Sequence, residues 1–272
     1  MSELVAIQMV SVPDVQQNLK ALEIQLEKLQ VSTNTLVVLP ECFACFGGGD
    51  GTILAVAEVK NNGPVQQALQ ALARRYGVWL VAGTLPLRAS DPTKMTASCL
   101  LIDDSGKVVD EYQKIHLFDV QVADNTGSYM ESKHTQAGDR VVVADTPFGR
   151  LGMAVCYDIR FPALFQAMGQ IDVLTLPAAF TQTTGQAHWQ ALLQARAIEN
   201  QCYLVAADQG GTHPNGRQTY GHSCIISPWG EIAAEIRYGE GLVQSHLDLA
   251  RLAAIRQAMP VHQHNKFRSH LV

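Results

Sequence analysis

The chain has 272 residues, of which 47% are apolar and 17% are charged, and its formal net charge is −5. This length and composition predict a globular protein with a sizeable core. The negative charge and the scattered Lys and Arg residues give no support for nucleic acid or an anionic membrane surface as a partner. Residues 1–5 include an acid and only a short apolar run, and no stretch approaches the roughly 20 apolar residues of a membrane helix. We therefore expect a cytoplasmic protein without a membrane segment.

Strands and helices alternate in the first half of the predicted structure. Residues 5–11 are expected to form a strand, and a helix that Pro13 opens is expected to run to about residue 29. The continuous apolar run 35–39 predicts a buried strand that ends at Pro40-Glu41. The other predicted elements are a helix at 64–76, a strand at 78–83, a hairpin of 95–102 with 108–112, and a long polar loop at 118–139.

The second half adds hairpins to the same alternation. The predicted elements are a strand at 140–144, a strand ending at Cys156, a helix at 162–168, a strand at 173–176, a helix at 186–200, a strand at 201–207, a hairpin of 220–227 with 231–236, a strand at 242–247 and a helix at 249–258. Pro260 is expected to start an irregular tail. Because no linker or repeat interrupts this order, we expect a single domain over residues 1–272, with a core of about 3–248 and a C-terminal helix and tail at 249–272.

Three reactive side chains stand at the ends of predicted strands: Glu41 in Leu-Pro-Glu, Lys114 in Tyr-Gln-Lys-Ile-His, and Cys156 in Ala-Val-Cys-Tyr-Asp. A thiol can attack an amide carbon, a carboxylate can move the protons, and an ammonium can hold the developing oxyanion. Taken singly, each residue is more often a buried cysteine, a surface carboxylate or a solvated lysine. The three together predict thiol-dependent amide hydrolysis.

The strand, turn and Pro-led helix around Cys156 resemble a nucleophile elbow. Such a turn exposes the sulfur and aims backbone N–H groups at it, so we expect these groups and Lys114 to lower the thiol pKa. Asp158 and Arg160 follow directly after the apolar strand, and their charges indicate a polar cleft.

Three further stretches narrow the interpretation: Lys114-Ile115-His116-Leu117-Phe118-Asp119, Ala187-His188-Trp189 and residues 195–201. With Tyr220-Gly221-His222-Ser223 and Pro228-Trp229-Gly230, they make the chain resemble the nitrilase superfamily, and within it the Nit subgroup. The resemblance covers about residues 3–264. It implies a four-layer αββα sandwich, a Glu–Lys–Cys triad, a homodimer or higher homo-oligomer, and no cofactor or metal.

The resemblance also assigns roles to other residues. Glu131 matches a second family glutamate that orients Lys114 or assists proton traffic, although a plain loop carboxylate stays possible. The backbone N–H of Tyr157 is the candidate second oxyanion donor, and Arg160 is the candidate partner of a substrate carboxylate. Phe180, Thr181 and His188 complete the set of candidate substrate-binding residues.

Cysteine spacing offers a competing interpretation. Cys42 and Cys45 have the spacing of a redox or zinc pair, but no second pair exists in the sequence. The six cysteines of a chain of this length are expected to be free thiols. We therefore predict no metal site.

The resemblance leaves the substrate open between two kinds of Nit protein. One cleaves deaminated glutathione to α-ketoglutarate and cysteinylglycine, and the other is an ω-amidase acting on α-ketoglutaramate or α-ketosuccinamate. The stretch 198–207 and the short loop 209–219 favour the first kind, whereas residues 39–43 and 114–119 favour the second. Phe46 and the glycines after it stand where the second kind usually has a tyrosine, so deaminated glutathione is the preferred expectation. A catalytically silent binding module remains the alternative of a different class.

Overall fold

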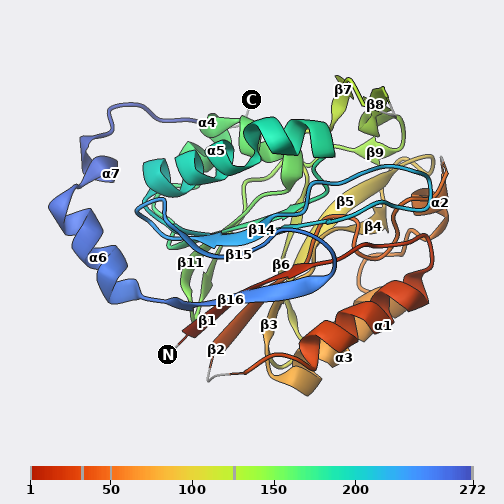
Figure 1. Cartoon of the computed structure of the whole chain (residues 1–272), viewed down its shortest axis with the longest axis horizontal. Coiled ribbons are helices and arrows are strands. Elements are labelled where there is room, and N and C mark those ends of the chain that lie inside the picture. Colours follow the sequence, from red (N-terminus) through yellow and green to blue (C-terminus); the bar gives the residue numbers. More distant parts are fainter. Residues whose placement is uncertain (1, 32–33, 50, 125–126, 271–272) are drawn as a thin grey trace.

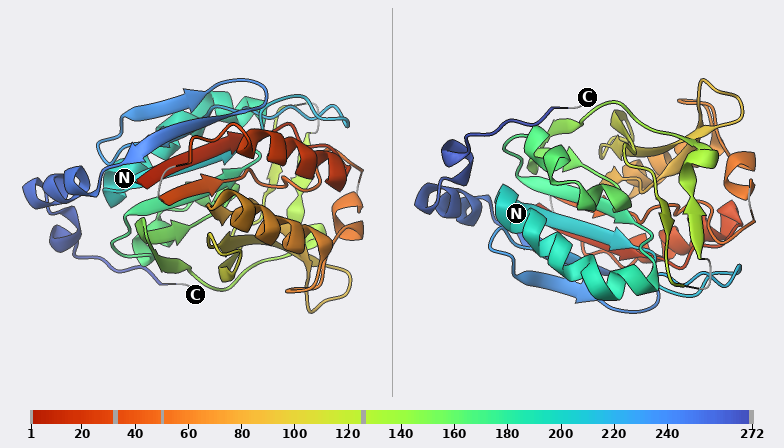
Figure 2. Two further views of the ribbon diagram at one scale, coloured as in Figure 1. Left: turned by 90° about the horizontal axis from the view of Figure 1, so that it is seen from below. Right: turned by 90° about the horizontal axis from the view of Figure 1, so that it is seen from above.

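Two β-sheets face each other and carry helices on their outer faces, giving the four-layer αββα sandwich that the resemblance implied (Figures 1 and 2). The computed structural model describes residues 2–31, 34–49, 51–124 and 127–270. Among them, no helix is both long and apolar enough to cross a membrane.

The first sheet contains the N-terminal strands and the last strand of the chain. Its main path is, in order, β16 (Gly241–Leu247), β1 (Ser2–Gln8), β2 (Asn34–Val38), β3 (Trp79–Val81), β5 (Met95–Ile102) and β4 (Leu85–Arg88), and β6 (Val108–Gln113) and β9 (Thr135–Gln136) also pair with β5. Strands β1, β2 and β3 are mutually parallel.

The second sheet is built from the middle of the chain. Its strands are, in order, β10 (Val143–Thr146), β11 (Gly149–Met153), β12 (Val173–Ala178), β13 (Tyr203–Asp208), β14 (Ser223–Ile226) and β15 (Ile232–Ile236). Here β11, β12 and β13 are parallel. Residues that follow neighbouring parallel strands are therefore brought to one edge in each sheet, which is where α/β sheets usually carry their sites.

The alternation of side chains along β1 divides the core into layers. Leu4 and Ala6 pack between the two sheets, whereas Val5 and Ile7 pack beneath the first pair of helices. These helices are α1 (Val15–Leu26), with Asp14 as its N-cap, and α3 (Pro64–Tyr76). On the outer face of the second sheet lie α4 (Pro162–Ala167) and α5 (Gln182–Asn200) (Figure 1).

The C-terminal segment begins with α6 (Leu249–Ala258), as predicted, but α7 (Val261–His264) follows where an irregular tail was expected. Both helices extend from one end of the sandwich (Figure 1). At the other end lie the short α2 (Thr52–Ala55) and the hairpin of β7 (Asp119–Gln121) and β8 (Ser128–Met130).

That hairpin corrects the prediction of a long loop at 118–139. A 3₁₀ turn at Glu131–Lys133 and strand β9 come after it, so most of the described part of this segment is regular structure. The polar sequence was misleading because a small two-stranded sheet at the molecular edge needs little apolar content of its own.

Candidate active site

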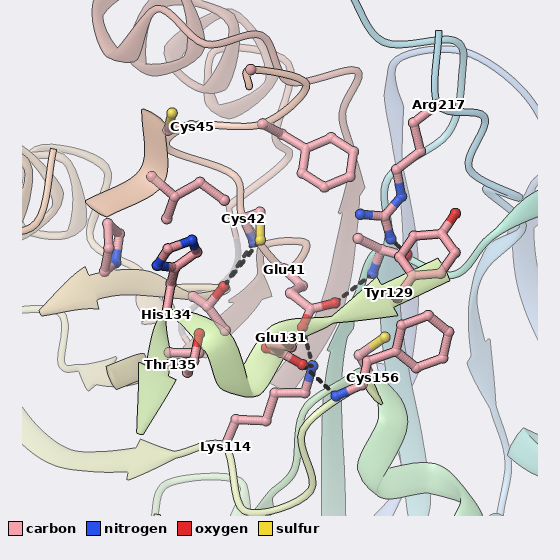
Figure 3. Close-up of a pocket in the computed structure, with 18 of the residues that line it drawn as sticks. Glu41, Cys42, Cys45, Lys114, Tyr129, Glu131, His134, Thr135, Cys156 and Arg217 are labelled. Atoms are coloured by element: carbon pink, nitrogen blue, oxygen red, sulfur yellow. Dashed lines mark hydrogen bonds and ion pairs between the residues drawn. The ribbon is translucent and has the colours of Figure 1, made fainter. Parts of the chain in front are cut away.

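The three residues predicted to act together converge at one end of the sandwich. Glu41 lies three residues beyond β2, Lys114 directly follows β6, and Cys156 lies three residues beyond β11 (Figure 3). Their relative exposures are 5%, 2% and 7% respectively. The carboxylate of Glu41 and the amine of Lys114, which follow strands of the first sheet, thus meet the thiol of Cys156, which follows a strand of the second sheet.

Lys114 is held between two carboxylates. Its Nζ lies 2.7 Å from Glu41 Oε1 and 2.8 Å from Glu131 Oε2, and this second oxygen also accepts a hydrogen bond of 2.7 Å from the Phe118 backbone N–H. Burial alone would lower the pKa of Lys114, but Glu131 and Glu41 outweigh it and hold that pKa well above 10.5. The side chain is therefore an ammonium. The predicted orientation of Lys114 by Glu131 has a direct geometric basis.

The backbone fixes the orientation of Glu41. Its Oε2 accepts a hydrogen bond of 3.0 Å from the Ala179 N–H, directly beyond β12, and its own N–H donates to the Ala178 carbonyl at 3.2 Å. Gln209 Nε2 donates to the Glu41 carbonyl at 3.0 Å. The next residue, Cys42, has a left-handed φ of 56°, the kind of local strain that clusters at functional sites.

Cys156 stands at a sharp turn between strand β11 and a 3₁₀ helix that spans Cys156–Arg160. Its φ is 47°, a left-handed conformation that costs roughly 1–2 kcal/mol for a residue with a side chain. This is the strand–turn–helix context that the sequence predicted, and Pro162 opens α4 directly after it.

The prediction of a lowered thiol pKa was wrong. Burial is the largest cause of a pKa of Cys156 well above 9.0, and the charge of Glu41 and a hydrogen bond with it add to the effect. Lys114 and the Ala179 N–H act in the opposite direction but do not compensate. Cys156 is consequently a neutral thiol beside a carboxylate.

Asp158 was expected in a polar cleft, but it is fully buried. Its Oδ2 accepts hydrogen bonds from Tyr112 Oη at 2.7 Å and the Val155 N–H at 2.8 Å. Its Oδ1 lies 3.1 Å from the His116 N–H and 2.7 Å from His116 Nδ1. Asp158 therefore joins the Cys156 turn to the segment that carries Lys114.

A cavity of about 330 Å³ opens over these residues. Tyr157, Phe180 and Thr181, which are candidate residues for binding substrate or the oxyanion, line it. Arg160 and His188 do not belong to its lining, because Arg160 stacks on the ring of Phe180 and points Nη1 at His188 Nδ1, 3.3 Å away. His188 itself is exposed on α5, so the structure does not place these two candidate substrate-binding residues among those that line the cavity.

Sequence reasoning missed the residues at one end of the cavity. Arg217 lies in the loop between β13 and β14, and its guanidinium carbon sits 4.8 Å from the ring centre of Phe46 and 4.9 Å from that of Tyr129 (Figure 3). The available signal was a basic residue in the Asn215-Gly216-Arg217 turn. Such a turn is ordinarily solvated, so only tertiary contacts reveal its direction.

Cys42 and Cys45 also line the cavity, and all six cysteines are free thiols, as predicted. Burial raises the pKa of Cys42 to about 12, with smaller contributions from Glu41 and Glu131. The described ranges contain no group of three or more His, Cys, Asp or Glu side chains that could hold a metal ion.

Comparisons with known proteins identify the family of the chain. The family model "carbon-nitrogen hydrolase" matches residues 4–257. The deaminated glutathione amidase of Yersinia enterocolitica is 43% identical over 269 residues, which cover 98% of this chain and 93% of that protein.

Two crystal structures are similar over nearly the whole chain. Nit3 of Saccharomyces cerevisiae, a member of branch 10 of the nitrilase superfamily, has a TM-score of 0.86 and 31% identity and covers 97% of this chain and 96% of its own. The NitFhit protein of Caenorhabditis elegans has a TM-score of 0.87 and 36% identity, and the match covers 97% of this chain but 65% of that longer one. The chain is therefore an amidase of the carbon–nitrogen hydrolase family.

Proposed function

We propose that this amidase hydrolyses deaminated glutathione to α-ketoglutarate and cysteinylglycine. The observation that carries the proposal is the buried Glu41–Lys114–Cys156 cluster, with Glu131 on the ammonium, at the floor of a cavity of about 330 Å³. The name and 43% identity of the Yersinia enterocolitica relative support the choice of substrate. No cofactor is needed, because the thiol, carboxylate and ammonium supply the nucleophile, the proton transfer and the oxyanion partner.

In the first half of the reaction, Glu41 accepts the proton of the Cys156 thiol while the sulfur attacks the amide carbon. Lys114 and the Tyr157 backbone N–H stabilise the oxyanion. The C–N bond breaks as Glu41 returns the proton to the leaving amine, so a thioester and a neutral amine result. A neutral thiol next to the base fits this order of events, because the thiolate then forms only when substrate is attacked.

In the second half, Glu41 accepts a proton from water, and the hydroxide attacks the thioester carbon. The tetrahedral intermediate collapses to the free acid and the Cys156 thiolate, and the proton on Glu41 returns to the sulfur. Glu131 keeps Lys114 in position throughout, since its Oε2 is fixed by the Phe118 N–H at 2.7 Å. Glu131 is in this scheme a positioning residue.

The test compares kcat/KM for deaminated glutathione and α-ketoglutaramate side by side. A preference of at least about 30-fold for deaminated glutathione, roughly 2 kcal/mol of transition-state discrimination, is expected. The reverse preference would make the protein an ω-amidase. C156A is the blank and should lose turnover at least about 10⁴-fold while it folds normally. Wild-type protein that cleaves neither amide would instead favour a silent binding module.

The proposed assembly is a homodimer in a reducing cytoplasmic compartment. Large apolar side chains are exposed on α5, on the turn before β15 and along the C-terminal segment: Ile198, Trp229, Leu249, Met259 and Phe267. Exposed apolar surface of this kind is typical of protein interfaces. Light scattering should give twice the chain mass, and W229E should lower it towards one chain. A wild-type monomer at micromolar concentration would contradict the assembly.

A further inference from the structure

We propose that Arg217 binds the carboxylate on the acyl arm of the substrate and so fixes the direction in which the amide lies across Cys156. The inference deepens the proposed function, because it names the group that recognises the acid end. It applies equally to any short dicarboxylic acid whose far end is an amide.

Aromatic rings hold the side chain of Arg217 at the cavity. Phe46 and Tyr129 flank the guanidinium at 4.8 Å and 4.9 Å, distances at which a cation interacts favourably with a ring face. His213 supports Phe46 through an edge contact of 4.3 Å and is itself held between the Ser11 carbonyl at 2.9 Å and Thr219 Oγ1 at 2.8 Å. The guanidinium is thus positioned before any substrate arrives.

The hydrogen-bond donors of Arg217 are only partly used. Nη2 donates to the Ala179 carbonyl at 3.2 Å, whereas Nε is buried without a hydrogen-bond partner. Within the described part of the chain, no carboxylate forms an ion pair with Arg217. A partly buried cation with an unused donor is costly unless an anion completes it, and a carboxylate can accept two parallel bonds from the guanidinium edge.

The charges near Cys156 explain why a positive group is needed there. Glu41 and Glu131 share a single ammonium, that of Lys114. The inner cavity therefore carries an excess of negative charge and would repel an anionic substrate. Arg217 adds the positive charge that offsets this repulsion at the acid end.

Ala179 connects Arg217 to the nucleophile. The Ala179 carbonyl accepts a hydrogen bond from Arg217. The Ala179 N–H donates to Glu41 Oε2 at 3.0 Å and also hydrogen bonds to the thiol of Cys156. A carboxylate on Arg217 is therefore a few carbons from the attacked carbon. The opposite end of the cavity, where Figure 3 shows Cys45, His134 and Thr135, is left for the departing amine.

The experiment compares the monoamide of glutaric acid with pentanamide, which has the same number of carbons but no carboxylate. Wild-type enzyme should prefer the acid amide. R217Q should lower kcat/KM for the acid amide about 10- to 100-fold, the range for a lost charge-assisted hydrogen bond, and change pentanamide less than about threefold. R217K should fall between, because lysine keeps the charge without the planar fork.

R237Q is the matched control, since Arg237 is exposed and lies outside the cavity lining, and it should keep the wild-type preference. Each result is a ratio of two amides within one variant, so a partly unfolded preparation does not alter it. Calorimetric binding of glutarate gives the same comparison without turnover, with an affinity lowered about 10- to 100-fold in R217Q.

A wild-type enzyme without preference for the acid amide, or an R217Q variant that keeps both the preference and the glutarate affinity, would overturn the proposal. These outcomes are separate from the failure of deaminated glutathione as the substrate. An enzyme that ignores deaminated glutathione but loses glutarate binding in R217Q would retain the Arg217 site and lose only the proposed substrate.

Discussion

The reactive cluster and the Arg217 region of the same cavity are held in place by different kinds of contact. Lys114 comes directly after a β-strand, and Glu41 and Cys156 each lie three residues beyond one. Buried hydrogen bonds and ion pairs from both sheets hold this cluster. Arg217 comes from a loop, and two aromatic rings and a single carbonyl hold it. The reacting groups are thus fixed by the fold itself, whereas the group that we propose for recognition depends on contacts between loops.

This difference has a consequence for substrate choice. Strand ends cannot move without disturbing the core, so the chemistry should tolerate little change. Loop residues tolerate substitution better, and they are where binding specificity usually varies. Perturbing the two regions should therefore give effects of different size and kind.

The largest effect is expected from D158N, which disrupts the buried hydrogen bonds that join the Cys156 turn to the segment carrying Lys114. The Asp158 carboxylate accepts from Tyr112 Oη, the Val155 N–H, and the backbone N–H and Nδ1 of His116, and an amide would turn N–H groups towards some of these donors. We expect a loss of about 3 kcal/mol of unfolding free energy and a Tm lower by about 6–12 °C, together with reduced kcat. D145N, at an exposed carboxylate on β10, is the control. An unchanged Tm would contradict the role given to Asp158.

The next effect concerns the protonation of Cys156. Because its pKa lies well above 9.0, alkylation by iodoacetamide should rise with pH throughout the range from about 7 to 9. E41Q removes a negative neighbour that disfavours the thiolate, so its profile should move to lower pH. Mass spectrometry of the Cys156 peptide follows the rate. A wild-type plateau that begins near neutral pH would restore the sequence-based expectation of a lowered pKa.

The comparison of the two regions also separates what the sequence could predict from what it could not. A mixed sheet covered by helices was predictable from the apolar runs, whereas the four-layer αββα sandwich was expected only from the family resemblance. Glu41, Lys114 and Cys156 could be singled out because each stands at the end of a predicted strand. The thiol pKa was not predictable, since it depends on the balance of burial, Glu41 and Lys114 at the final distances. Arg160 was chosen for its place in the sequence near Cys156, but one 3₁₀ turn carries it to Phe180 and His188 instead.

A smaller effect is expected from F46L, which removes one ring from Arg217. The lost cation–π contact of about 0.5–2 kcal/mol should raise KM for the monoamide of glutaric acid roughly 2- to 30-fold. The value of kcat should stay near wild type, because Phe46 lies beside Arg217 and not beside the proton-transfer groups. Steady-state kinetics with pentanamide as the comparator measures the change. An equal loss on both amides would mean that Phe46 shapes the cavity in general and does not act through Arg217.

The smallest effect is expected from H188A, which tests how far the substrate-binding region around Arg217 extends towards α5. His188 is exposed on α5 and contacts Arg160, which stacks on the ring of Phe180. Its removal should change kcat/KM for the acid amide less than about twofold, as is usual for surface substitutions away from a site. A tenfold loss in the same assay would mean that substrate extends past Phe180 to α5. In that case the recognition region would include the face that carries Arg160, and Arg217 would share the carboxylate with it.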